Sequence, residues 1–199
     1  YMFGGQTKVP LVIRTAAGWG QLAATHSQFF EAWFAHVPGL TVVMPSTPYD
    51  AKGLLKAAIR LEDPVLFIEH VRLYGMKGEV PDGEYTVPIG LPEVKREGQD
   101  VTIVAYSRML HTSLAAAEIL AKEGIECEVI DLRTLRPLNL EPAYESVKKT
   151  HRVLVVTEDW MTLGMSAEVA ARISRDRFDW LDGPVERLGQ IEVPVPYAK

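Results

Sequence analysis

The sequence predicts an α/β protein of two units, each a parallel sheet enclosed by helices in three layers. Short apolar runs recur along the chain, and segments with helical periodicity separate them. Strands that alternate with helices in this way form parallel sheets covered on both faces. A stretch rich in glycine and proline divides the pattern into two series. With 199 residues, the chain has room for one large or two small domains.

The first series contains three strands, at 9–15, 41–46 and 65–70. Each is a nearly continuous apolar run, which is typical of strands buried on both faces. A helix between the second and third strands has a clear start, because Ser46 or Thr47 can cap it and Pro48 suits its first turn. We expect this helix to end near Arg60.

Large apolar residues predict another helix between the first two strands. They recur at the spacing of one buried helix face: Phe29, Phe30, Trp33, Phe34 and Val37. His26 falls on that same face, one turn before Phe30. This histidine therefore either fills the core or faces a cavity in which chemistry takes place.

Residues 76–98 form the expected linker between units at 1–75 and 99–199, with 85–90 along a sheet edge. The second series then resumes the alternation of strand and helix. Its expected strands are 101–107, 126–132 and 152–158, its helices are about 110–123, 141–150 and 164–175, and a last extended piece is 185–193.

Composition excludes two classes of function. The formal net charge is −5 and the basic residues are interspersed with acidic ones, which argues against a nucleic-acid-binding face. No apolar run of about 18 residues is present, so we expect no membrane-spanning helix. Cys127, the single cysteine, falls in a strand-like run and is expected to be a buried, reduced thiol.

His26 is the best-placed candidate for chemistry. It follows a loop of small residues, 15–25, which itself follows a strand, and ligands of such sheets bind beyond the carboxyl ends of strands. Histidine exchanges protons near neutral pH. A histidine that only packs in the core or caps a helix is the alternative, and the pattern alone favours it slightly.

Other polar residues close the predicted strands. Four of them either cap the next helix or contact a ligand: Glu69, His70, Glu158 and Asp159. Arg133 and Arg136 either bind an anionic partner or pair with local acids. The dinucleotide, P-loop and nucleophile-elbow motifs are absent from the sequence, and no histidine or cysteine grouping has the spacing of a zinc site.

The whole chain resembles the β subunits of the thiamine-dependent E1 component of 2-oxo acid dehydrogenase complexes, those of pyruvate dehydrogenase in particular. The phrases that carry the resemblance are YMFGGQTKVPLVIR (1–14), THSQFFEAWFAHVPGL (25–40), PSTPYDAKGLLKAAI (45–59), EHVRLYG (69–75), DLRTLRPLN (131–139) and VPVPYA (193–198). Their shared order makes a chance match improbable.

This resemblance implies a domain assignment and a cofactor. Residues 1–75 correspond to the later part of a transketolase-like pyrimidine-binding domain, and 99–199 to a transketolase C-terminal domain. The glutamate that activates thiamine diphosphate is expected upstream of Tyr1, and a closing helix beyond Lys199. The chain lacks the family's diphosphate and Mg²⁺ motif, which implies that an α subunit holds both.

The resemblance also implies roles for individual residues. His26, in the family's His-Ser-Gln phrase, is expected to be the catalytic residue that handles protons in the active-site channel. Asp182 matches a residue that docks the E2 acyltransferase. A potassium ion held by backbone oxygens would fall at Leu11, Ala58, Ile59, Leu61 and Asp63. Residues 157–171 are one position shorter than in relatives, which weakens any assignment to Glu158 or Trp160.

The expected function is that of an oxidoreductase subunit, active only in an α2β2 heterotetramer. It would decarboxylate a 2-oxo acid, pyruvate in the first instance, and reductively acylate the lipoyl group of E2. Branched-chain 2-oxo acid and acetoin dehydrogenases are the alternatives in substrate, and a noncatalytic subunit that scaffolds E1 on E2 is the alternative in class. The expected location is the cytoplasm, or the mitochondrial matrix in a eukaryote.

Overall fold

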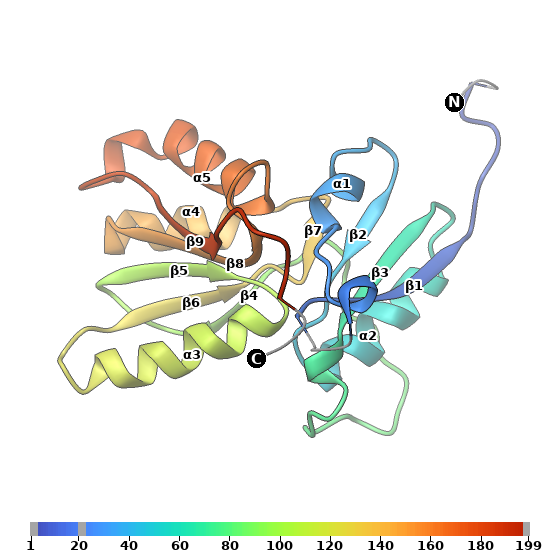
Figure 1. Cartoon of the computed structure of the whole chain (residues 1–199), viewed down its shortest axis with the longest axis horizontal. Coiled ribbons are helices and arrows are strands. Elements are labelled where there is room, and N and C mark those ends of the chain that lie inside the picture. Colours follow the sequence, from blue (N-terminus) through green and yellow to red (C-terminus); the bar gives the residue numbers. More distant parts are fainter. Residues whose placement is uncertain (1–3, 20–22, 197–199) are drawn as a thin grey trace.

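The computed structural model describes residues 4–19 and 23–196, and it contains two sheets side by side (Figure 1). The first sheet has four strands in the order β1-β3-β2-β7, and the second has five in the order β4-β6-β5-β8-β9. The predicted α/β class with two mainly parallel sheets is confirmed. Both sheets are mainly parallel, but each also takes an antiparallel strand at one edge.

The first sheet is built from the three predicted apolar runs. Its strands are β1 (Val12–Ala17), β2 (Thr41–Val43) and β3 (Val65–His70), with β3 between the other two. Helix α2 (Pro48–Ile59) covers one face through Leu54 and Ala58. The predicted start of this helix is confirmed, because the Thr47 side chain accepts a hydrogen bond of 3.1 Å from the Asp50 backbone N–H.

The helix predicted from the spacing of Phe29, Phe30, Trp33, Phe34 and Val37 is wrong in both length and buried face. Helix α1 covers only Glu31–Ala35, and Trp33 is 73% exposed. Phe29 precedes the helix and is buried against Trp160 of the second unit. The apolar spacing is therefore satisfied by contacts outside the helix as well as by a helical face.

The second unit follows the predicted alternation closely. Its parallel strands are β5 (Val101–Ala105), β6 (Cys127–Asp131), β8 (Val153–Trp160) and β9 (Glu186–Gln190). Helix α3 (Arg108–Ala121) covers one face, and α4 (Glu141–Thr150) and α5 (Met165–Asp176) cover the other. Figure 1 shows these three layers.

Short 3₁₀ turns occur in both units. The first unit has η1 (Ala24–His26) and η2 (Val71–Leu73), and the second has η3 (Phe178–Trp180).

Two short antiparallel strands complicate the predicted division. Strand β4 (Glu93–Arg96), within the predicted linker, pairs with β6, and β7 (Thr134–Arg136), within the predicted second unit, pairs with β2 of the first sheet. The segment 85–90 forms no strand, although Val87 is buried against the α2 core. The chain thus crosses between the two sheets more than once.

One apolar core joins the two sheets. The first sheet and its connections contribute Ala17, Val42, Met44 and Ile68, and the second contributes Val104, Tyr106, Ile130 and Leu132. A shared core of this kind fixes the mutual position of the carboxyl edges of the sheets. Cys127 is buried and unpaired, as predicted. Among the described residues, no helix is long and apolar enough to cross a membrane.

We predict that Gly98→Ala strongly destabilises the fold. Gly98 is buried, and an added Cβ would lie 2.2 Å from the backbone carbon of Cys127, so β6 itself would have to shift. A loss of about 3 kcal/mol in the free energy of unfolding, measured by guanidinium denaturation, is expected. Gly183→Ala is the control, since no atom lies within 4 Å of an added Cβ there. Equal stability of the two variants would contradict the packing of 98 against β6.

Candidate active-site region

The carboxyl edges of the two sheets meet at an ion-paired cluster. His70 ends β3, and its Nε2 lies 2.6 Å from Oε2 of Glu158 on β8. Arg108, the first residue of α3, donates to the other Glu158 oxygen at 2.9 Å. His70 is buried, so this contact connects the units away from bulk water. Of the four polar residues predicted at strand ends, His70 and Glu158 thus come together here, whereas Glu69 bonds Arg14 and Tyr74 of its own unit.

Trp19 lies over the same cluster. Its ring is flanked by the guanidinium groups of Arg72, at 5.0 Å from the ring centroid, and Arg108, at 5.5 Å. Its Nε1–H donates a 2.5 Å hydrogen bond to the Pro196 carbonyl oxygen. Cation–π contacts of this kind favour a fixed ring orientation. The loop after β1 is therefore tied to both units at once.

His26 lies at the end of η1, in the segment between β1 and α1, and its side chain is exposed. The prediction that it shares a buried helix face is wrong, because α1 begins five residues later. Its Nδ1 lies 2.8 Å from the Thr25 hydroxyl. Among the described residues, this is the hydrogen bond made by the ring. Its catalytic role stays a prediction.

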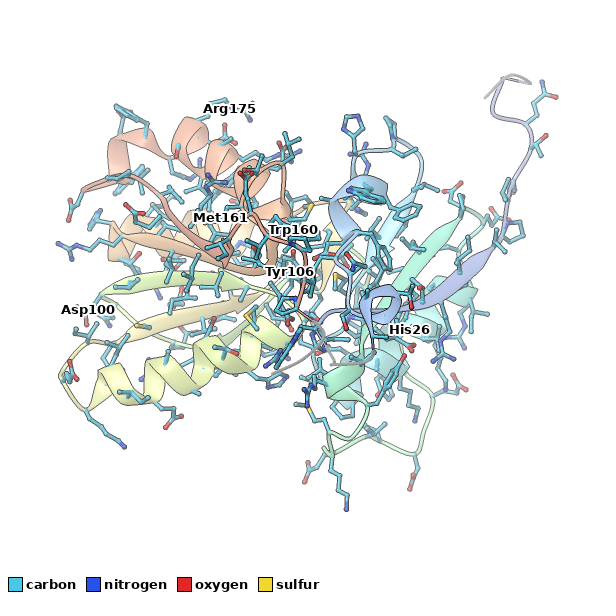
Figure 2. All side chains as sticks on the ribbon, viewed as in Figure 1. His26, Asp100, Tyr106, Trp160, Met161 and Arg175 are labelled. Carbon is cyan, nitrogen blue, oxygen red and sulfur yellow. The ribbon has the colours of Figure 1, made fainter. Side chains whose placement is uncertain are left out.

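Three contacts hold the segment after His26. Ser27 is fully buried, and the Gln28 carbonyl accepts a 3.0 Å hydrogen bond from the Gly18 N–H. Phe29 meets Trp160 edge to face, with ring centroids 5.8 Å apart. Glu31 accepts a 3.1 Å hydrogen bond from the Tyr106 hydroxyl. Figure 2 shows Tyr106 and Trp160 at the end of the second sheet that faces the first unit, where His26 lies.

The Glu31 contact is electrostatically unusual. Burial and, secondly, the charge of Asp159 raise the pKa of the Glu31 carboxyl to about 7. Burial also raises the pKa of Asp159, and it raises that of Tyr106 well above its ordinary value. Tyr106 therefore stays a hydrogen-bond donor throughout the neutral range. Sequence reasoning missed Tyr106, which carries no recognisable motif in the run after β5.

Asp159 also settles one of the sequence alternatives. Its Oδ2 accepts a 2.8 Å hydrogen bond from the Met165 N–H, so it caps the start of α5. Gly164 is required beside it, because a Cβ there would lie 2.0 Å from the Trp160 carbonyl oxygen. The shortened turn in 157–171 is thus closely packed against the end of β8.

The sequence leaves open whether Arg133 and Arg136 bind an anionic partner or pair with groups of the same chain. In the structure both bond groups of the same chain. Arg133 is buried and donates 2.9 Å hydrogen bonds to both Asp50 and Glu93. Arg136 donates to the Ala35 carbonyl oxygen at 3.2 Å. These contacts connect the segment after β6 to the first unit. Both arginines therefore serve the packing of the two units.

The residues of the predicted potassium site lie around the end of α2 and the start of β3. The Leu11 carbonyl accepts a hydrogen bond from Val65, and that of Ala58 accepts one from Leu61, while Ile59 and Asp63 are exposed. Within 4–19 and 23–196, no group of three or more acidic, histidine or cysteine side chains could hold a metal ion. The potassium site stays a prediction.

Asp182, predicted to dock a partner, lies in an exposed turn after η3. Its carboxylate is 3.1 Å from the Arg152 guanidinium, and its backbone N–H donates to the His151 carbonyl. Both side chains of this pair are more than half exposed. The pair is open to solvent, so a charged partner could reach Asp182.

Comparison with known protein families identifies both parts of the chain. Residues 1–77 match the model "Transketolase, pyrimidine binding domain", and residues 90–199 match "Transketolase, C-terminal domain". The chain belongs to the transketolase family. Among solved structures, a split-gene transketolase described as an inactive β4 tetramer superimposes with a TM-score of 0.78 and 28% identity, over 94% of this chain and 59% of that one.

Curated relatives in this family are β subunits of oxidoreductases. The chain is 50% identical to a pyruvate dehydrogenase E1 component subunit β of Porphyra purpurea, over 99% of the chain and 60% of the relative. It is 51% identical to a 2-oxoisovalerate dehydrogenase subunit β of Bacillus subtilis, over 100% and 62%. It is 48% identical to an acetoin:2,6-dichlorophenolindophenol oxidoreductase subunit β of Cupriavidus necator, over 100% and 59%. The chain thus spans about three fifths of each relative.

We predict that Glu31→Gln removes a pH dependence of stability. Between pH 4.5 and about 7 the folded protein keeps the Glu31 proton and the unfolded chain has lost it, so stability falls as pH rises through this window. The shift corresponds to a free energy on the order of 3 kcal/mol. The free energy of unfolding is measured by guanidinium denaturation at pH 5 and pH 8. The stability of the variant relative to wild type should be higher at pH 8 than at pH 5.

The exposed acid Glu145 of α4 supplies the control variant for this measurement, Glu145→Gln. If the stabilities of wild type and Glu31→Gln fall in parallel between the two pH values, Glu31 does not retain its proton in the fold.

Proposed function

We propose that this chain is part of the β subunit of a thiamine diphosphate-dependent 2-oxo acid dehydrogenase E1. The observation that carries the proposal is the exposed His26 of the His-Ser-Gln phrase, beside the meeting carboxyl edges of the two sheets. The family is thiamine diphosphate dependent, and the relatives of this chain include pyruvate dehydrogenase E1 β subunits. The proposed reaction is decarboxylation of a 2-oxo acid followed by reductive acylation of the lipoyl group of E2.

In this proposal the cofactor site is shared between chains. The described residues offer no acidic cluster for Mg²⁺. We propose that an α partner in an α2β2 assembly holds Mg²⁺ and the diphosphate, and that this chain contributes the pyrimidine side. Bound thiamine diphosphate supplies the electron sink for decarboxylation. Names of relatives as subunits support the α partner.

His26 is the proposed catalytic residue of this chain. With Nδ1 engaged by Thr25, its Nε2 can donate a proton to, or accept one from, a reacting oxygen or sulfur. The Thr25 contact fixes the ring orientation, which is what directional proton transfer requires. Solvent exposure in the single chain is consistent with a channel whose other wall comes from a partner.

The substrate is proposed to be pyruvate. The relatives of similar identity named for 2-oxoisovalerate and for acetoin favour a second candidate, a branched-chain or acetoin dehydrogenase. The proposed location is the mitochondrial matrix if the source is eukaryotic, which a relative named as mitochondrial supports, and the cytoplasm otherwise.

We predict that His26→Ala lowers kcat of the reconstituted enzyme by about 100-fold, the size expected for loss of general acid–base catalysis. Reduction of lipoyl groups is measured with pyruvate, 2-oxoisovalerate and acetoin in parallel, with α partner, thiamine diphosphate and Mg²⁺ present. Release of CO₂ is followed for the two 2-oxo acids, and release of acetaldehyde for acetoin, which has no carboxyl group to lose. His36→Ala, at another exposed histidine beyond α1, is the control. Full turnover by His26→Ala would leave this chain with a scaffolding role.

We also propose that Asp182 docks a basic surface of E2. Asp182→Asn is expected to weaken E2 binding by about tenfold, since it removes one exposed charge pair at an interface. Titration calorimetry of the assembled E1 with the E2 subunit-binding domain measures this, with Asp179→Asn in the nearby η3 turn as the matched control. Equal affinities of the two variants would place the docking surface elsewhere.

A further inference from the structure

The segment that carries His26 lacks the means to hold its own conformation. Its 3₁₀ turn has three residues, no side-chain cap, and begins after Ala23, whose φ is 62°. Helix α1, which follows, has only five residues. Helices this short are not stable by themselves in water. The position of His26 must therefore be set by contacts elsewhere.

Gly18 of the first unit donates a backbone hydrogen bond to the Gln28 carbonyl, and two further contacts come from the second unit. Within the segment, Gln28 Nε2 donates a 2.6 Å hydrogen bond to the Ala24 carbonyl, which ties the segment to itself. Phe29 and Glu31 instead reach Trp160 on β8 and Tyr106 after β5. The Phe29–Trp160 contact is an edge-to-face pair that packs the segment against β8. The Tyr106 hydroxyl and the Glu31 carboxylate define a direction.

This polar contact is maintained at a cost in stability. Glu31 is 1% exposed and Asp159 is 3% exposed, and each has one carboxyl oxygen without a hydrogen-bond partner among the described residues. An apolar residue at 31 would avoid the desolvation of a carboxyl group. A buried acid that packing does not need is better explained by the geometry that it enforces.

We propose that Tyr106 is a positioning residue for His26, acting through its hydrogen bond to Glu31. The bond fixes the first turn of α1 against the second unit. Because His26 lies only five residues before Glu31, the position of its imidazole ring is then fixed as well. The inference rests on the proposed function of His26. Neither Tyr106 nor Glu31 needs to touch substrate or cofactor.

The test compares variants in the reconstituted α-containing enzyme. Tyr106→Phe deletes one hydroxyl and should lower kcat about tenfold, because small misplacements of a catalytic group are costly, with KM for the 2-oxo acid little changed. Glu31→Ala should do the same, and Glu31→Gln, whose amide oxygen still accepts the hydroxyl proton, should recover most of the loss. Tyr144→Phe is the matched control. It also removes one tyrosine hydroxyl, whose 2.7 Å hydrogen bond joins α4 to Asp176 of α5 and does not contact the segment of His26.

A double-mutant cycle separates positioning from general stability. If Tyr106 acts through His26, Tyr106→Phe causes no further loss in the His26→Ala background, whereas an additive tenfold loss overturns the proposal. An unchanged kcat in both Tyr106→Phe and Glu31→Ala overturns it as well. If His26→Ala itself is fully active, the function of His26 fails first and the positioning role falls with it.

Hydrogen exchange gives a readout that does not depend on turnover. In the folded enzyme, amides of 23–30 should exchange at least tenfold faster in Tyr106→Phe than in wild type, and those around α4 should not. Tyr144→Phe should leave 23–30 unchanged. If Tyr106→Phe does not fold, Glu31→Gln and Glu31→Ala are compared instead. Equal exchange over 23–30 in that pair, or in wild type and Tyr106→Phe, overturns the proposal.

Discussion

The apolar core shared by the carboxyl edges of the two sheets is the constraint on which the rest of the structure depends. Strand ends carry polar side chains and free backbone groups, so bringing two such edges together buries many of them. The contact is stable only if each finds a partner across it. Ser46 shows how: its hydroxyl donates to Asp131 at 2.9 Å and accepts from the Ser107 N–H at 2.8 Å.

The same constraint explains why charged groups of this interface are so thoroughly paired. Asp50 is fully buried and is matched by Arg133, which also bonds Glu93. An unpaired charge at such depth would cost several kcal/mol, roughly the margin of a whole domain. Where pairing is incomplete, a proton substitutes for a partner: burial raises the pKa of Asp131 to about 7, as it does for Glu31.

Elements that depend on residues close in sequence could be predicted, and elements that depend on distant partners could not. Helix α2 follows from Thr47 and Pro48, and most strands follow from apolar runs, because these depend on neighbours in sequence. Strands β4 and β7 have four and three residues and are defined only by distant partners. The aromatic spacing before α1 misled for the same reason, since Phe29 packs on Trp160 and not within a helix. His26 could be singled out from its place after a strand and loop, and the resemblance gave it a role, while Tyr106 became visible only in three dimensions.

The division of labour between the two units follows from these facts. The first unit presents His26 on a segment too short to be rigid, and the second unit supplies the rings and the hydroxyl that hold it. A catalytic group needs freedom from burial to meet a substrate, and it also needs a fixed position to act on one. A side chain can be both exposed and fixed in position when residues a few positions away in the sequence are buried and anchor the segment. If His26 has the proposed catalytic role, the contact between the sheets serves both catalysis and folding through the same side chains.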